Sequence, residues 1–328
     1  MERKTQRMQS NSSDSSNDKY KTSPNAADDV DNERIHEIHE IHEETITRFS
    51  YHETIIGGSP ERMSGGGLAD VHMHTTFSDG TGTVEEVLGF VERYTPLDVI
   101  AITDHDTIDG ALHARDLAAR RSYPFEVIVG EEISTREGHM LALFLEKAVP
   151  PDLSIERSIE LVHAQGGLAI IAHPFNRVFR HSVQRKVMNR LLRQPEVHPD
   201  GIETLNGSFA GIGSSHIALT LARSTYHWAE TGGSDAHTPT AVACAHTLFP
   251  GHTAAELRAA VRSRATMARG SYWQAREYVA FVSHRMGYGG AATHAGAELP
   301  QTTLARLRQH GMTRGTTRGT TRGMRQAG

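Results

Sequence analysis

The stretch that decides the fold of this chain is Ala69-Asp70-Val71-His72-Met73-His74-Thr75-Thr76-Phe77-Ser78-Asp79-Gly80. Side chains alternate between the two faces of a strand, so Asp70, His72 and His74 share one face. Two imidazoles one pleat apart can reach a single ion, and Asp79 follows on a Ser-Asp-Gly turn. An isolated pair of this kind is more often two surface histidines, so its interpretation depends on the rest of the chain.

Four further segments place imidazole or carboxylate groups beside apolar, strand-like runs. They are Thr103-Asp104-His105-Asp106, Gly130-Glu131-Glu132-Ile133-Ser134 with Gly138-His139, Ala172-His173-Pro174 and Gly233-Ser234-Asp235-Ala236-His237. Oxygen and nitrogen donors without a thiolate cluster suit manganese, zinc or iron rather than a sulfur-rich structural site. The recurrence of such groups at strand ends therefore predicts a metal site.

The order of the apolar patterns indicates strands that alternate with helices. Strands are predicted at residues 99–103, 127–130, 140–144, 168–172 and 201–206. Helices are predicted after capping boxes at Thr83 and Thr253, and at residues 108–121, 154–165, 180–193 and 214–226, with 180–193 exposed and basic. Short loops between these elements imply βαβ units and a parallel sheet. The gathering of reactive groups at strand ends favours a closed or distorted α/β barrel over an open sheet.

Polar segments flank the predicted folded region at residues 67–270. Residues 1–66 read as a disordered, low-complexity tail with a His-Glu tract at 36–44, and 290–328 as a disordered basic tail with Arg-Gly-Thr repeats. One amphipathic helix is expected at 271–289.

The net charge of −5 gives no electrostatic case for nucleic acid or anionic membrane as a partner. No apolar run of about 18 residues and no secretory signal is present, so a cytoplasmic protein without an obligate protein partner is expected.

The motifs quoted above resemble, in this order, those of the PHP (polymerase and histidinol phosphatase) family of metal-dependent phosphoesterases, over residues 68–265. The resemblance implies a distorted (β/α)7 TIM-like barrel with two or three divalent metal ions (Mn, Zn or Fe) at the strand ends. It implies three ligand sets: His72, His74, Glu132 and Asp235; Glu132, His139 and His173; and Asp79, His105 and His237. Glu132 would bridge the first two sets. The family's Gly-x-Glu pattern selects Glu132 over Glu131, which points to the opposite face of the strand.

The same resemblance implies hydrolysis of a phosphate ester by a hydroxide that the metal ions activate, with Glu132, Asp235 and His237 as catalytic residues. The expected substrate is a nucleotide or another small phosphorylated metabolite. Arg177 and Arg136 are candidate substrate-binding residues because guanidinium matches phosphate geometry, and Asn206 is a third candidate at a strand end.

Several alternatives stay open from the sequence. The same site could serve an oligonucleotide exonuclease, and an amidohydrolase or a non-catalytic metal-binding module are further alternatives. Asp70 and Asp104 either orient metal-binding histidines or cap turns. Glu203 and Asn206 lie at another predicted strand end, as pocket groups or as groups that support the ligands.

Overall fold

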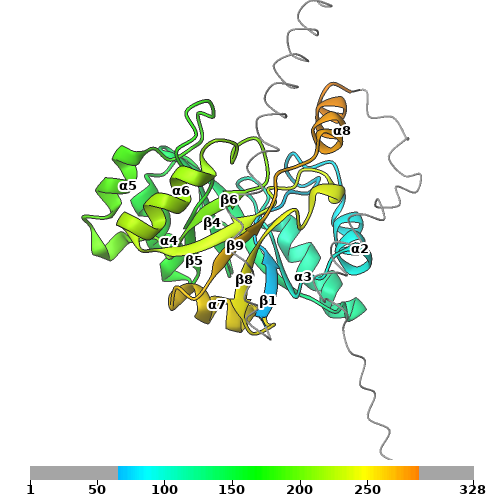
Figure 1. The fold of residues 1–328 in the computed structure, drawn as a ribbon. Helices are drawn as coiled ribbons and strands as arrows, with labels where there is room; N and C mark the ends of the chain where they lie inside the picture. Colours follow the sequence, from blue (N-terminus) through cyan, green and yellow to red (C-terminus); the bar gives the residue numbers. More distant parts are fainter. Residues whose placement is uncertain (1–65, 288–328) are drawn as a thin grey trace, which may run out of the picture. The chain divides into compact units, whose positions relative to one another are not determined.

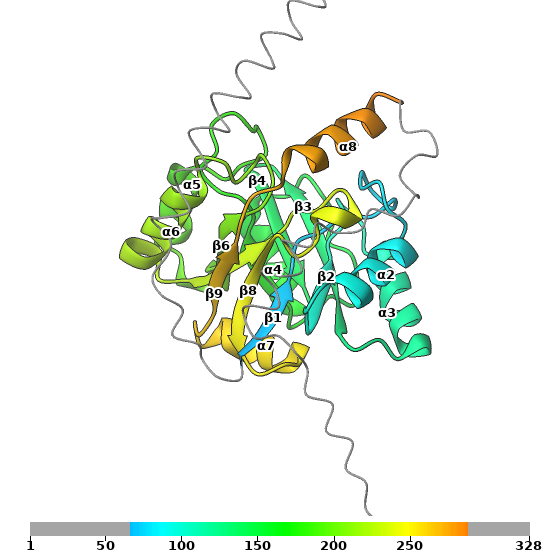
Figure 2. The ribbon, with the colours of Figure 1, turned by 45° about the vertical axis from the view of Figure 1, so that its right-hand side comes forward.

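One sheet of nine strands organises residues 66–287, the part of the chain that this computed structural model describes. In spatial order the strands are β7 (Ala229–Gly233), β6 (Gly201–Asn206), β5 (Leu168–Ile171), β4 (Gly138–Leu143), β3 (Glu126–Thr135), β2 (Val99–Ile102), β1 (Gly66–Asp70), β8 (Ala245–Pro250) and β9 (Met267–Gly270). The sheet curls into a nearly closed barrel (Figures 1 and 2). The hydroxyl of Thr247 on β8 helps to close it, because it accepts from the amide of Gly232 on β7 and donates to the carbonyl of the same residue, both at 2.9 Å. The predicted distorted α/β barrel is confirmed.

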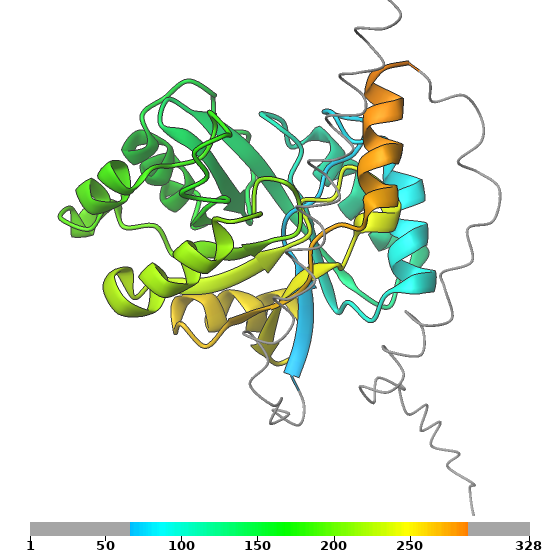
Figure 3. The same ribbon diagram turned by 45° about the horizontal axis from the view of Figure 1, so that its top comes forward.

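Helices surround this sheet, and the last of them lies beside the loops at one end of the barrel (Figures 1 and 3). They are α2 (Val84–Tyr94), α3 (Asp109–Arg121), α4 (Ile155–Ala164), α5 (Arg185–Leu191), α6 (Ser215–Leu221), α7 (Ala254–Arg262) and α8 (Ala275–Arg285). Both predicted capping boxes are present. Thr83 accepts from the amide of Glu86, whose carboxylate accepts from the amide of Thr83, and Thr253 and Glu256 form the same pair. Each satisfies amides that would otherwise lack partners in the first turn of its helix.

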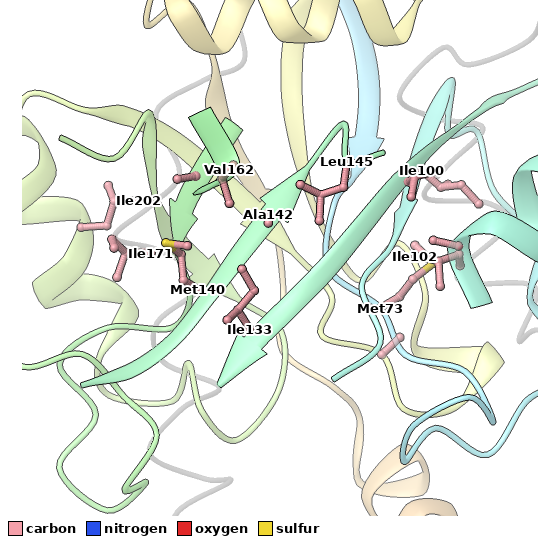
Figure 4. Packing of buried hydrophobic residues seen from close by; sticks show 14 of the residues in the cluster. Met73, Ile100, Ile102, Ile133, Met140, Ala142, Leu145, Val162, Ile171 and Ile202 are labelled. Carbon is pink, nitrogen blue, oxygen red and sulfur yellow. The ribbon is translucent and has the colours of Figure 1, made fainter. Parts of the chain in front are cut away.

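Strands β2, β4, β5 and β6 are buried on both faces, whereas β8 and β9 are partly exposed. One hydrophobic cluster joins Ile100, Ile102, Ile133 and Ile171 to apolar residues of α2 to α6 (Figure 4). A second cluster contains the alternate residues of the same strands together with Leu257 and Val261 of α7. Because these four strands are closed to solvent on both faces, polar groups that they carry must find partners inside the protein.

The structure differs from the sequence prediction at several elements. Strand β4 runs antiparallel to β3 and β5, because Arg136 and Glu137 alone separate β3 from β4 and a two-residue hairpin cannot provide a parallel crossover. The short strands β8 and β9 were not predicted, since neither has a continuous apolar run. The predicted exposed helix at 180–193 is wrong in extent and character: α5 covers Arg185–Leu191 and buries Met188 and Leu191. The helix predicted at 214–226 is present as α6 followed by a π-helical segment at Ala222–Tyr226.

The predicted helix at 271–289 corresponds to α8, whose first residue is Ala275. Apart from Gly66, the predicted tails, the His-Glu tract and the Arg-Gly-Thr repeats lie outside the described residues. None of the helices within residues 66–287 combines the length and the apolar composition that a membrane-spanning helix needs.

Glu131 on β3 is a buried carboxyl group that lies away from its neighbour Glu132. Its Oε2 accepts from the amide of Val149 at 2.9 Å, whereas its Oε1 has no hydrogen-bond partner in the described part of the chain. Burial raises the pKa of Glu131 to about 7, even though the bond from Val149 lowers it. The ionised form is therefore disfavoured in the folded protein, and folding becomes less favourable as the pH rises from about 4.5 through 7.

We predict that Glu131→Gln stabilises the protein at pH 8, by about 1–3 kcal/mol, and changes its stability little at pH 5. The amide keeps the shape of the side chain but cannot ionise. Thermal melting at the two pH values measures the effect. Glu92→Gln, at an exposed position on α2, is the matched control and should show no such dependence. An equal gain at both pH values would contradict this account of Glu131.

Candidate metal centre

Nine imidazole and carboxylate side chains meet at one end of the barrel and form what we call the histidine–carboxylate cluster. Its members are His72, His74, Asp79, His105, Glu132, His139, His173, Asp235 and His237. They come from the segments after β1, β2, β5 and β7, from the second half of β3 and from the start of β4. The structure thus brings together all nine residues that the sequence predicted as metal ligands.

The carboxylate of Glu132 lies at the centre of this cluster and is 1% exposed. Its Oε2 is 3.1 Å from His72 Nε2 and 3.2 Å from His74 Nε2. Its Oε1 is 2.9 Å from His139 Nδ1 and 2.9 Å from His173 Nε2. Each oxygen therefore faces a different pair of imidazoles. A carboxylate that bridges two cations needs this arrangement.

Asp235 completes the group around Glu132 Oε2. Its Oδ1 lies 3.4 Å from His72 Nε2 and 3.2 Å from His74 Nε2. One donor atom from each of His72, His74, Glu132 and Asp235 lies within 4.8 Å of the others. This is the first ligand set that the family resemblance implied.

Asp79 organises a further group at the more exposed side of the cluster. Its Oδ1 is 3.2 Å from His237 Nε2 and 3.8 Å from His105 Nε2. The Nδ1 of His74 also lies 3.8 Å from this oxygen. His105 faces Glu132 as well, with Nδ1 3.4 Å from Oε2, so it stands between two groups, which the sequence did not indicate.

Several buried donor atoms in the cluster have no hydrogen bond within the described residues. They are both ring nitrogens of His74, Nδ1 of His139, Nδ1 of His173 and Oδ1 of Asp79. Nδ1 of His139 lies close to Glu132, but not in hydrogen-bonding geometry. Buried polar atoms normally find a partner, so the free nitrogens of His74 and the free oxygen of Asp79 are available to bind a cation. Imidazole and carboxylate donors suit divalent manganese, zinc or iron, and the cluster fits such ions.

The electrostatics of the cluster also favour a cation. Burial alone lowers the pKa of His74, but the carboxylates of Asp235 and Glu132 outweigh this effect and raise it to about 10. Burial would raise the pKa of Glu132, yet His72, His139 and His105 hold it well below its usual value. The carboxylates are thus ionised and attract positive charge, which protons supply when metal ions do not.

A buried carboxylate, Glu203 on β6, holds two cluster histidines in place. Its Oε1 accepts from His72 Nδ1 at 2.9 Å, so the other ring nitrogen of a neutral His72 presents its lone pair to the cluster. Its Oε2 accepts from the backbone amide of His173 at 2.8 Å. His173 has a positive φ of 26°, which is uncommon for a residue other than glycine, and this bond helps to hold that backbone. A Cβ at Gly233 would overlap both His72 and Glu203, so this contact requires glycine there.

Asn206 also supports the cluster, from a position that is 1% exposed. Its side-chain N–H groups donate to Glu203 Oε2 at 3.0 Å and to Asp235 Oδ2 at 3.1 Å, and its Oδ1 accepts from Ser208. Both N–H groups are used by these contacts, so the geometry favours a role in positioning Asp235. A direct contact between Asn206 and substrate stays a prediction.

Asp70 and Asp104 cap turns and do not contact an imidazole ring. Asp70 accepts from the backbone amides of Ser234 at 3.0 Å and Ala243 at 2.9 Å. Asp104 accepts from the amide and the hydroxyl of Thr75, both at 2.7 Å, and from the Ser78 hydroxyl. These bonds fix the two loops that carry His74, Asp79 and Asp235, which decides between the alternatives that the sequence left open.

The two candidate arginines lie in different settings. Arg136 is exposed, and its guanidinium donates to the carbonyl of Asp152 at 2.8 Å, outside the cluster. Arg177 is exposed on the loop after β5. Neither is placed against a cluster residue, and their role in substrate binding stays a prediction.

Sequence reasoning missed two groups beside the cluster. The ring of His181 stacks on that of His139, with centroids 4.7 Å apart, and its carbonyl accepts from the His139 amide at 2.7 Å. Phe281 of α8 packs edge-on against His237, at a centroid distance of 4.9 Å. No sequence motif marks either residue, because chain segments that are distant from the motifs carry them into place.

Comparisons with known families agree with this geometry. The family model described as PHP domain matches residues 70–233, and a second, described as PHP-associated, matches residues 217–266. Together they span the segments that supply the nine cluster residues.

Similar proteins include both uncharacterised proteins and enzymes. An uncharacterised protein of Methanocaldococcus jannaschii is 39% identical over 149 residues, which are 42% of this chain and 81% of the relative. A 5'-3' exoribonuclease of Salmonella typhimurium is 26% identical, over 52% of this chain and 86% of its own length. A 3',5'-nucleoside bisphosphate phosphatase of Chromobacterium violaceum is 36% identical, over 25% of this chain and 29% of its own length.

A solved structure shares the fold. It is a two-domain protein of Bacteroides vulgatus that contains a predicted PHP-like metal-dependent phosphoesterase, with a TM-score of 0.52 and 20% sequence identity. The likeness covers 63% of this chain and 65% of that one. At this level of identity the comparison shows the barrel alone.

We predict that Glu203→Gln lowers metal affinity by about 10- to 100-fold while the protein stays folded. An amide in this place must turn its N–H₂ group toward a donor, either His72 Nδ1 or the pair formed by the His173 amide and Asn206, and it also removes the charge that supports His72. Titration of the metal-free protein with manganese measures the affinity, and the melting temperature checks the fold. Glu230→Gln, on β7 in a surface ion pair with Arg223, is the control. Equal manganese affinity in the two variants would show that Glu203 does not support the metal centre.

Proposed function

The chain belongs to the PHP domain family of phosphoesterases, and we propose that its substrate is a small phosphomonoester, either a nucleotide or a phosphorylated metabolite. The observation that carries this proposal is the carboxylate of Glu132, whose two oxygens face separate pairs of imidazoles. Two cations held so close together can engage two oxygens of one phosphate group.

The proposed cofactors are two or three divalent ions of manganese, zinc or iron. His72, His74, Glu132 and Asp235 would hold one. Glu132, His139 and His173 would hold a second, with His105 also close to this group. Asp79, His105 and His237 would hold a third. Such ions neutralise phosphate oxygens and lower the pKa of a water molecule to near neutrality. Glu132, Asp235 and His237 are the proposed catalytic residues.

The protein's own groups shape this site. The Asp235 carboxylate is fixed by the Asn206 amide and by the Ser208 hydroxyl at 2.7 Å, so its free oxygen stays directed at the imidazoles. Glu203 holds His72 through Nδ1. Preorganised groups of this kind need no reorganisation during the reaction, and this property makes electrostatic stabilisation effective.

The alternative hydrolase class is not favoured by the residues around the cluster. An amidohydrolase often needs a lysine that bridges two metal ions. Lys147 is the one lysine between Phe125 and Pro174, and its side chain is exposed. A non-catalytic module is not favoured either, because all nine cluster residues are present and converge.

A second candidate function is 5'-3' exonuclease activity on short RNA. It is supported by the exoribonuclease of Salmonella typhimurium, 86% of whose length aligns with this chain. Both functions use the same centre and differ in whether a nucleotide chain can lie beside it.

An assay of the manganese-loaded full chain distinguishes these functions. We expect phosphate release from nucleoside monophosphates or small phosphorylated metabolites, and less turnover of 5'-phosphorylated oligoribonucleotides. Faster release of mononucleotides from the oligoribonucleotides would select the exonuclease instead. Absence of turnover with every phosphate ester would refute both functions.

The loop after β5 carries a cationic side chain, Arg177, four residues beyond His173 of the cluster. The Ser182 hydroxyl donates to the His173 carbonyl at 2.6 Å, and Asn176 accepts from the amides of Val178 and Phe179, so the loop has a defined conformation. Arg177 lies between these contacts, and an exposed guanidinium there can pair with phosphate oxygens.

We predict that Arg177→Ala lowers kcat/KM by about tenfold, with unchanged metal content, because a charge-assisted phosphate contact is lost. Lysine should restore part of the activity, since it supplies the charge without the planar fork. Steady-state kinetics and metal analysis measure these effects, with Arg185→Ala on α5 as the control. If the kinetics of Arg177→Ala equal those of wild type, Arg177 does not bind the substrate phosphate.

A further inference from the structure

An open cleft of about 400 Å³ lies beside the cluster, between the turn that follows β1 and the end of α8. It is lined by Thr76, Ser78, Asp79, Gly80, His284 and Arg285. Asp79 belongs both to this cleft and to the group that contains His105 and His237. A molecule bound at the cluster can therefore extend directly into the cleft.

The cleft depends on the position of α8, which is fixed by the segment before it. The indole of Trp273 donates to the carbonyl of Ser234 at 2.7 Å, and its backbone amide donates to Gly207 at 2.7 Å. Phe281 then packs against His237. Residues four apart lie on the same side of a helix, so Arg285 follows Phe281 one turn further along this face. Figures 1 and 3 show α8 beside the loops at this end of the barrel.

Besides the Asp79 carboxylate, which faces His237 and His105, the cleft holds two side chains that suit an anion, His284 and Arg285. Within residues 66–287, neither His284 nor Arg285 has an ion-pair partner, whereas Arg276 on the same helix pairs with Glu277 at 2.6 Å. Arginine is the side chain best matched to phosphate, because its planar guanidinium can donate two parallel hydrogen bonds. An arginine without a carboxylate partner, at the edge of a phosphate-binding centre, is thus placed to bind a second anionic group of the same ligand.

Helix α8 lies beyond both matched family segments, which end at residues 233 and 266. The cluster supplies the chemistry that the family shares, so an added helix beside it can set substrate choice. We propose that Arg285, assisted by His284, binds a second phosphate group of the substrate while the scissile phosphate lies at the cluster. This inference rests on the proposed function. The second phosphate belongs either to a nucleoside bisphosphate or to the next linkage of an oligonucleotide, since both present the same chemistry.

The test compares three substrates of the manganese-loaded full chain: adenosine 5'-monophosphate, adenosine 3',5'-bisphosphate and the 5'-phosphorylated dinucleotide of adenosine. The readout is the ratio of kcat/KM for each two-phosphate substrate to that for the monophosphate. We expect Arg285→Ala to lower this ratio at least about tenfold, mainly through KM, and His284→Ala to lower it less. Arg276→Ala, on the same helix, should leave the ratio unchanged. The substrate with the larger loss identifies the source of the second phosphate.

Other outcomes overturn the proposal. If Arg285→Ala leaves kcat/KM unchanged for all three substrates, Arg285 does not bind a second phosphate. If kcat/KM falls equally for all three, the ratio is again unchanged, and Arg285 acts on the scissile phosphate or on the fold. If wild type hydrolyses none of these compounds and no p-nitrophenyl phosphate, the proposed function fails separately. Calorimetric binding of adenosine 3',5'-bisphosphate then decides the inference, and equal affinity of wild type and Arg285→Ala overturns it.

Discussion

The placement of one carboxylate, that of Glu132, between two pairs of imidazoles is the constraint on which the structure of this site depends. A charge that is 1% exposed is costly unless opposite charges surround it. Here the histidines at 2.9–3.2 Å, and the cations that they can hold, provide that compensation. The barrel brings the ends of β1, β3, β4 and β5 together at one point, and this convergence makes such a centre possible.

A second layer of buried carboxylates keeps the ligands in place. Glu203 orients His72, whereas Asp70 and Asp104 fix the loops that carry the remaining ligands. Glu203 bonds to two members of the cluster, whereas Asp70 and Asp104 bond to the loops around it, and none of the three belongs to the nine cluster residues. Such contacts hold His72, Asp235 and the backbone of His173 in place without any bound ion.

Much of this arrangement could be predicted from the sequence, and the failures have physical causes. Apolar runs located β2 and β5 because strands buried on both faces have no alternation. The motifs located all nine cluster residues, since each motif lies beside a strand end. The direction of β4, the strands β8 and β9, and the extent of α5 depend on hairpin length and on contacts with distant segments. The place of Arg285 could not be predicted either, because it follows from the packing of Trp273 and Phe281 against loops that are far away in sequence.

The central claim is that Glu132 bridges two metal ions, and a paired substitution on β3 tests it most directly. Metal content and phosphate release are measured for Glu132→Gln and for its neighbour Glu131→Gln, whose side chain binds the Val149 amide instead of the cluster. The account predicts that Glu132→Gln binds fewer ions and loses nearly all turnover, while Glu131→Gln matches wild type in both. A full complement of metal and normal turnover in Glu132→Gln, or loss of both in Glu131→Gln alone, would contradict it.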